Sequence, residues 1–146
     1  MSGPIHRWTA RQTRQAIRGK ETSARCQMCH TIDGVGAELG PALEGWGRGK
    51  SAEVIATAIV NPNAEIAFGY EGTELKMKDG LTIQGVLIKQ SDPLMMRSMG
   101  GVTQIIPNDR VATRQRMKQS LMMNAAQLGL TAQDVADLVA FLQPTK

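Results

Sequence analysis

The feature that most restricts this sequence is the stretch ARCQMCHTIDG at residues 24–34, in which two cysteines stand three positions apart and a histidine follows directly. The chain has only two cysteines and two histidines, so three of these four residues fall within five positions. Any fold of this chain must therefore present Cys26, Cys29 and His30 together on one short piece of backbone.

Three interpretations of this motif are weak. A disulfide between Cys26 and Cys29 would close a very small loop and add little stability. A thioredoxin-like redox pair needs a preceding strand, whereas the residues before the motif are rich in Arg and Gln and favour a helix. A structural zinc site needs four ligands, and His6 is the only other strong candidate.

The remaining interpretation is covalent attachment of a c-type haem, for which this spacing is the sequence signature. Each thiol would bond to one vinyl group of the porphyrin, and an imidazole nitrogen of His30 would bind the iron as the proximal ligand. A large apolar cofactor would also explain why only 3% of the residues are aromatic. One haem c is therefore the predicted cofactor.

The segment GAELGPALEGWGRGKS at 36–51 resembles the region after the haem motif in class I c-type cytochromes. In that family a proline carbonyl accepts a hydrogen bond from the proximal imidazole, and Pro41 stands at the matching position. Trp46 and Arg48 match residues that contact the haem propionates, and a forked guanidinium suits a carboxylate. A packed Trp and a solvated Arg are the alternatives for these two residues.

A closer resemblance joins three stretches, CQMCH, MKDGLTIQGVLI and QSLMMNAAQLGLTAQDVADLVAFL, which together are similar to a haem-binding domain family of planctomycetes and related bacteria. Members of that family are often attached to larger dehydrogenase-like or membrane-linked proteins. Its Ser-Leu-Met segment implies that Met122 is the distal iron ligand opposite His30. Met123 stands where the family commonly has proline and is the alternative ligand.

The resemblance predicts a mainly α fold, in which a class I cytochrome c helical core carries a small inserted antiparallel β-meander, with an SH3-like form as one option. Helices are expected over 7–18 with a stop at Gly19, over 51–62, and from a capping box at Thr131 and Asp134. Turn signals between Tyr70 and Val111 predict about four short strands. One cytochrome domain would span 1–146, with the haem core at 1–69 and 112–146 and the insertion at 70–111.

The expected function is one-electron transfer by a haem with His and Met ligands. The protein would be an electron carrier, or a domain that serves a dehydrogenase, and not itself an enzyme. The alternative is a haem with a labile distal site that binds a gas or a peroxide. A third interpretation is that methionines bind Cu(I). The ordinary alternative is that these methionines fill the hydrophobic core. The methionines concerned are Met95, Met96, Met99, Met117, Met122 and Met123.

The charge distribution indicates the class of partner. Residues 1–30 carry six basic side chains and one acidic one. Two groups of basic residues stand out. In the simplest interpretation they form a solvated surface, and in the alternative they form a docking site for an acidic redox protein. They are the stripe Arg7, Arg11, Arg14 and Arg18, and the cluster Arg110, Arg114, Arg116 and Lys118. Nucleic acid is not expected, because stacking aromatics and a known binding motif are missing.

The sequence contains no apolar run long enough to span a membrane. Its first residues, MSGPIHRWTARQTRQ, lack the apolar centre of a secretory signal. In the family that it resembles, haem is attached outside the cytoplasmic membrane. The resemblance therefore implies a periplasmic protein whose signal peptide is absent from this sequence.

Overall fold

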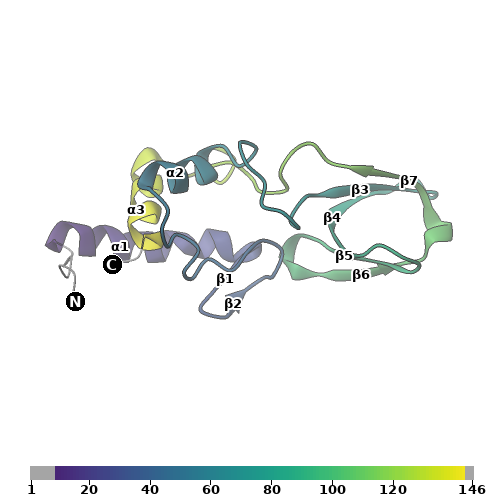
Figure 1. Cartoon of the computed structure of the whole chain (residues 1–146), viewed down its shortest axis with the longest axis horizontal. Helices are drawn as coiled ribbons and strands as arrows, with labels where there is room; N and C mark the ends of the chain where they lie inside the picture. Colours follow the sequence, from purple (N-terminus) through teal and green to yellow (C-terminus); the bar gives the residue numbers. More distant parts are fainter. Residues whose placement is uncertain (1–8, 144–146) are drawn as a thin grey trace.

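The structure is a computed structural model that describes residues 9–143. Within this range the chain forms three α-helices toward one end of an elongated molecule and a β sheet at the other end (Figure 1). The helical elements are α1 (Ala10–Thr22), α2 (Ala52–Val60) and α3 (Ala132–Leu142), with the 3₁₀ helices η1 (Ser23–Met28), η2 (Met99–Gly101) and η3 (Asn108–Arg110). None of the described helices is both long and apolar enough to cross a membrane.

The strands pair antiparallel in two sheets. A small hairpin after η1 contains β1 (Thr31–Ile32) and β2 (Val35–Gly36). The larger sheet has the order β6-β5-β4-β3-β7. Its strands are β3 (Thr73–Met77), β4 (Thr82–Lys89), β5 (Leu94–Arg97), β6 (Thr103–Ile106) and β7 (Val111–Arg116).

The predicted mainly α fold class is wrong. Helices make up 33% and strands 23% of the structure, which is an α+β fold. The sheet is also longer than the predicted insertion at 70–111, because residues 111–116 form β7 and pair with β3. Residues 112–116 therefore belong to the sheet and not to the predicted helical core.

The physical reason is that the sheet has a hydrophobic core of its own. Its buried cluster joins residues of strands that are not neighbours in the sheet, so one face closes on itself instead of packing on the helices (Figure 1). The cluster consists of Leu75, Met77, Leu94, Met96 and Ile106. The side chain of Met96 is fully buried there, as expected for a core-filling methionine.

A second hydrophobic cluster holds the helices together. Ile55 and Ile59 of α2 pack with Leu138 and Val139 of α3, and Ala125 completes the buried group. The predicted cap of α2 is confirmed, since the Ser51 side chain accepts a hydrogen bond from the backbone N–H of Val54. Two separate cores therefore lie in this fold, one in the helices and one in the sheet.

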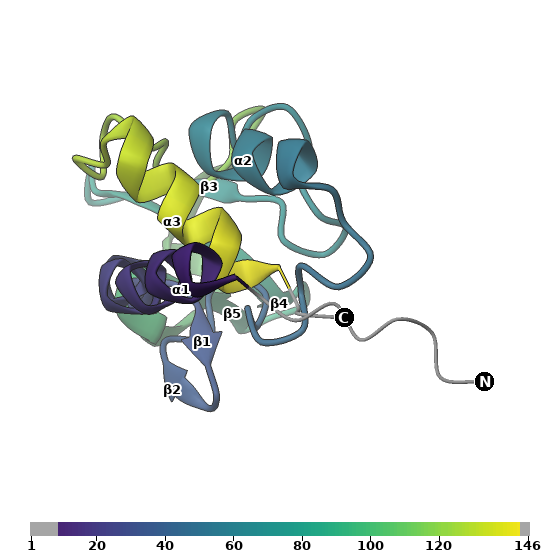
Figure 2. The same ribbon diagram turned by 90° about the vertical axis from the view of Figure 1, so that its left-hand side faces the viewer.

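Helices α1 and α3 cross at close range (Figure 2). The contact is centred on Gly19, which is buried; a Cβ atom there would collide with the backbone carbonyl of Asp137 and with Phe141. Gly19 was expected to end the first helix, but α1 continues to Thr22. The predicted start at Arg7 lies outside the described residues. Gly19 is required for the approach of α3, and it does not act as a helix stop.

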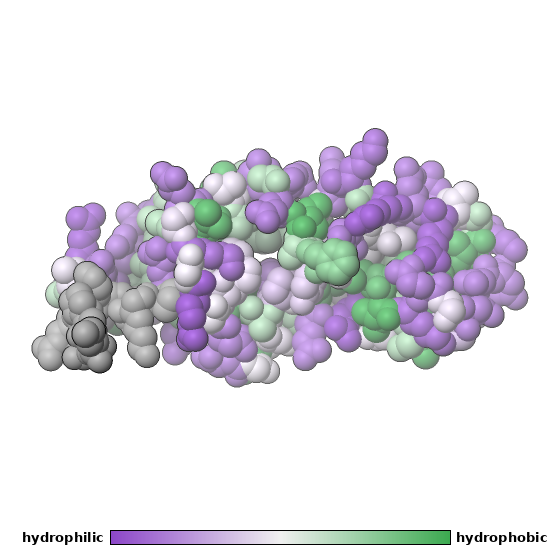
Figure 3. All heavy atoms as spheres, viewed as in Figure 1, coloured by the Kyte–Doolittle hydropathy of each residue, from purple (hydrophilic) through white to green (hydrophobic). Residues whose placement is uncertain are grey.

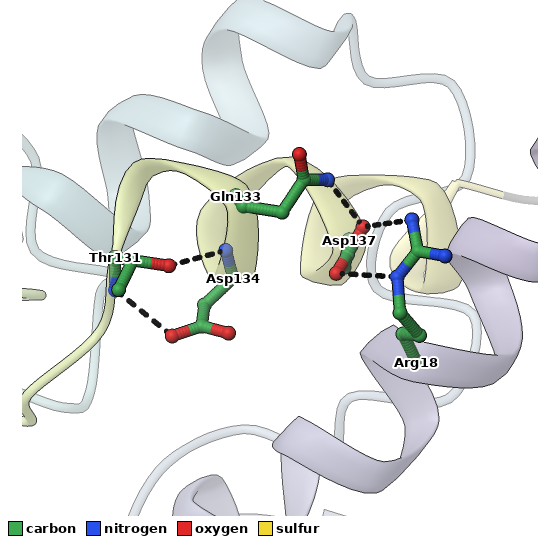
Figure 4. Close-up of polar contacts among 5 residues, drawn as sticks. All are labelled: Arg18, Thr131, Gln133, Asp134 and Asp137. Atoms are coloured by element: carbon green, nitrogen blue, oxygen red, sulfur yellow. Dashed lines mark hydrogen bonds and ion pairs between the residues drawn. The ribbon is translucent and has the colours of Figure 1, made fainter.

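A buried carboxylate reinforces this crossing (Figure 4). Arg18 Nε lies 3.1 Å from one carboxylate oxygen of Asp137, and Arg18 Nη2 lies 3.2 Å from the other. Gln133 also donates a hydrogen bond to Asp137. Mainly because of the bond from Arg18, the pKa of the Asp137 carboxyl is lowered from its ordinary value of 3.8. One turn earlier, Thr131 and Asp134 form the predicted capping box.

Replacing Gly19 tests the helix crossing. In an isolated helix Gly19→Ala should raise stability, because Ala is favoured over Gly by about 1 kcal/mol. In this fold the added Cβ meets α3, so we expect the free energy of unfolding to fall by about 1–3 kcal/mol in chemical denaturation. The exposed neighbour Arg14→Ala should change it by less than about 0.5 kcal/mol. A more stable Gly19→Ala variant would contradict the close approach.

Acid unfolding tests the buried carboxylate. Since the folded pKa of Asp137 lies below 3.8, its charged form stabilises the fold fully above that pH, and this contribution is lost as the pH falls through the folded pKa. We expect Asp137→Asn to lower the melting temperature at pH 7 and to lose much of that deficit under acid conditions. Exposed Asp109→Asn serves as the control. An equal deficit for Asp137→Asn at both pH values would show that the charge is not responsible.

Candidate functional site

The cysteine motif begins on η1, which continues directly from α1: Cys26 lies in η1, Cys29 follows its last residue, and His30 comes next. The carbonyl of Cys26 accepts hydrogen bonds from the N–H groups of Cys29 and His30, at 3.1 and 2.9 Å. The carbonyl of Cys29 then accepts from the N–H groups of Leu39 and Gly40. This tight backbone presents both thiols and the imidazole to one cavity.

His30 is oriented by the loop that follows. Its Nδ1 atom lies 2.7 Å from the carbonyl oxygen of Pro41, which places the proton on Nδ1 and leaves the lone pair on Nε2. Burial lowers the pKa of His30 from its ordinary 6.5 and outweighs the opposing effect of the Pro41 bond. The neutral ring is therefore available as a ligand at neutral pH.

Gly40 provides the space for this ring. A Cβ atom at position 40 would lie 2.5 Å from His30 Cε1 and 2.8 Å from His30 Nδ1. A side chain here would push the imidazole out of its place against Pro41. Gly40 thus lets the backbone approach the His30 ring closely, and Pro41 supplies the carbonyl that accepts its hydrogen bond.

The cavity has a volume of about 180 Å³ and opens to solvent. Most of its wall is apolar, with Leu39 and Leu43 beside the histidine, Ile59 from α2, and Leu138 and Leu142 from α3. In Figure 3 hydrophobic side chains border the hollow between the helical end and the sheet end of the molecule. An open, mostly apolar cavity suits a ligand with a largely hydrophobic surface.

Six of the seven site residues chosen from the sequence line this cavity: Cys26, Cys29, His30, Pro41, Trp46 and Met122. The alternative ligand Met123 lines it too. Arg48 does not: its side chain is exposed and lies outside the lining. Residues almost a hundred positions apart in sequence are thus brought to one site.

The cysteine thiols are protonated at neutral pH. Burial raises the pKa of each thiol from its ordinary 9.0, and the neighbouring Cys29 raises that of Cys26 further. A site for a thiolate nucleophile would instead lower these values. The two sulfurs are therefore held in an apolar wall and are not activated.

Several cavity residues could not be found from the sequence. Val86 of the sheet and Met99 of η2 belong to the segment expected as an insertion, and Met28 lies inside the motif itself. Glu65 and Arg25 add two charged groups to the lining. No local pattern assigns the residues outside the motif to the cavity, because their positions depend on contacts between distant segments.

Lys50 is a further contact that the sequence did not reveal. Its Nζ atom lies 4.4 Å from the ring centroid of Trp46 and donates a hydrogen bond to the Trp46 carbonyl at 2.6 Å. A cation over an aromatic face is stabilising when the ring is partly buried. Lys50 thus covers the indole at the cavity wall, whereas Arg48, the basic residue predicted to contact a haem propionate, lies outside the cavity.

The residues present fit a covalently attached haem. Two sulfurs and an imidazole with a free Nε2 share the wall of one mostly apolar cavity, which Met122 and Met123 also line. Among residues 9–143 no three His, Cys, Asp or Glu side chains are grouped so as to hold a metal ion. His6, the fourth ligand of the zinc interpretation, lies outside the described residues.

No protein-family model matches this chain, and no curated protein matches it.

Proposed function

We propose that this chain is a single-haem c-type cytochrome that transfers one electron at a time. The observation that carries the proposal is the cavity that unites the Cys26–His30 motif with Pro41, Trp46 and Met122. Haem iron supplies a couple between its ferrous and ferric states, and a Met ligand favours the reduced form. The class I cytochromes, and the haem-binding domain family that the sequence resembles, are the proposed relatives.

Each protein group has a definite role in this proposal. Cys26 and Cys29 anchor the cofactor through thioether bonds. His30 offers Nε2 as the proximal ligand, because the Nδ1 proton is committed to Pro41. Met122 is the proposed distal ligand. The apolar wall would cover the hydrophobic faces of the haem, and Arg48 is not part of this proposal because it is outside the cavity.

The sheet is proposed to belong to the same functional unit. Val86 and Met99 line the cavity, and Arg97 Nη1 donates a hydrogen bond to the carbonyl of Glu38 in the loop that leads to Pro41. A sheet attached at these points shields one side of the cofactor and supports the proximal loop. We assign it no chemistry of its own.

An acidic redox protein is the proposed partner. On α1, Arg11 and Arg14 are exposed, while Arg18 of the same predicted stripe is committed to Asp137, and Arg7 lies outside the described residues. In the second cluster Arg116 pairs with Glu71 at 3.0 Å. The proposal for docking therefore centres on Arg11 and Arg14. An electron carrier of this type, free-standing or serving a dehydrogenase, would act in the periplasm.

Covalent haem attachment tests the proposal directly. Expressed with a periplasmic leader and the machinery that forms thioether bonds, the chain should carry one haem that survives denaturation, seen in its mass and visible spectrum. Cys26→Ala with Cys29→Ala should lose the haem and fold poorly, because the cofactor would fill much of the helical core. Gln27→Ala is the matched control within the motif. A haem-free native chain, or a double variant with a cooperative melt, would contradict the proposal.

The adjacent methionines test the distal ligand. Met122→Ala should abolish the weak sulfur-to-iron charge-transfer band of the ferric protein, lower the reduction potential and admit external ligands, since a neutral thioether favours ferrous iron. Met123→Ala should leave these properties nearly unchanged. The opposite result would transfer the role to Met123. A wild type that lacks the band and binds gas or peroxide would support the alternative sensor function.

A further inference from the structure

The segment that carries Met122 is tied to the rest of the protein by its backbone. The Met117 N–H donates a hydrogen bond to the carbonyl of Gly72 at 2.9 Å. The Ser120 N–H donates to Asn63 Oδ1 at 2.7 Å, and the Met122 N–H donates to Ser120 Oγ at 3.1 Å. A short chain of hydrogen bonds therefore leads from Asn63 to Met122.

Asn63 itself belongs to a fixed turn at the end of α2. The Asn61 N–H caps the helix by donating to Thr57, and the Ala64 N–H donates to the Asn61 carbonyl. Pro62, between them, is buried and lines the cavity. The backbone on both sides of Asn63 is thus held by the turn after α2, and the exposed side chain of Asn63 offers its oxygen to the N–H of Ser120 in the segment that faces the cavity.

Met123 is held differently. Its N–H forms no hydrogen bond with any residue in the range 9–143. The next anchor is Asn124, which exchanges hydrogen bonds with Gln127 at 2.9 and 2.8 Å and begins the turn before α3. The two methionines therefore differ in backbone restraint although both line the cavity.

We propose that Asn63 is a positioning residue that, through Ser120, holds Met122 as the distal ligand in preference to Met123 or an external ligand. This inference rests on the proposed cytochrome function. A ligand whose backbone is already ordered loses less conformational freedom when it binds, so it competes better for the iron. Removing the Asn63 acceptor should weaken the binding of Met122 to the iron without replacing a residue of the cavity wall.

The test measures imidazole binding to the ferric, haem-loaded protein by visible spectroscopy. Asn63→Leu has a similar size and no acceptor, and we expect it to raise imidazole affinity about 2- to 10-fold, the equivalent of one net hydrogen bond. The charge-transfer band should weaken. Asn63→Asp keeps an acceptor oxygen and should restore values close to the wild type.

Asn61→Leu is the matched control, because the Asn61 side chain forms no hydrogen bond within the part of the chain that the structure describes. It should not change imidazole affinity. A general loss of structure in Asn63→Leu is recognised from its melting curve, and the Asn63→Asp variant then decides the question. No difference between Asn63→Leu and the wild type would overturn the proposal.

A double-mutant cycle separates positioning from a general structural effect. If Asn63 acts through Met122, Asn63→Leu should have no effect on imidazole affinity in a Met122→Ala background and its full effect in a Met123→Ala background. The same effect in both backgrounds would overturn the role. If the wild type shows the band and Asn63→Leu does not alter it, only this inference fails; a chain without covalent haem overturns the proposed function as well.

Discussion

The close crossing of α1 and α3 is the contact on which the helical part of this structure depends. Gly19 admits the backbone of α3 at Asp137, and Arg18 neutralises the buried carboxylate beside it. Because α1 runs directly into η1, this crossing also fixes the cysteine motif relative to α3. Leu138 and Leu142 of α3 then become walls of the same cavity. A shift at Gly19 would therefore reach the site itself.

Few polar interactions hold the candidate site, and each has a specific position. The hydrogen bond between His30 and Pro41 orients the imidazole, while Arg25 donates to the carbonyls of Leu128 and Gly129 and ties η1 to the loop before α3. Most other contacts in the cavity are apolar. This division suits the proposed haem, which would have a largely hydrophobic surface and an iron that needs one oriented nitrogen.

The sheet has a hydrophobic core of its own and still contributes residues to the candidate site. Its buried cluster needs no partner surface, which explains why the fold is α+β and not a helical domain with a small insertion. Arg97 joins the sheet to the loop before Pro41: it donates a hydrogen bond to the carbonyl of Glu38 and lies 3.8 Å from the Glu38 carboxylate. Gly101 of η2 lies near Ala37 in the same loop, since a Cβ atom at Gly101 would be 3.2 Å from the Ala37 Cβ. Through them, the sheet restrains the backbone that leads to Pro41.

The sequence alone determined what local spacing controls. The positions of Cys26, Cys29 and His30, the caps at Ser51 and Thr131, and the apolar face of α3 depend on residues a few positions apart, and the structure places them as local rules require. Only the tertiary structure decided the role of Gly19, the addition of β7 to the sheet beside β3, the exclusion of Arg48 from the cavity, and the link from Asn63 to Met122. These depend on partners far away in the chain, and no local pattern specifies which distant backbone will approach.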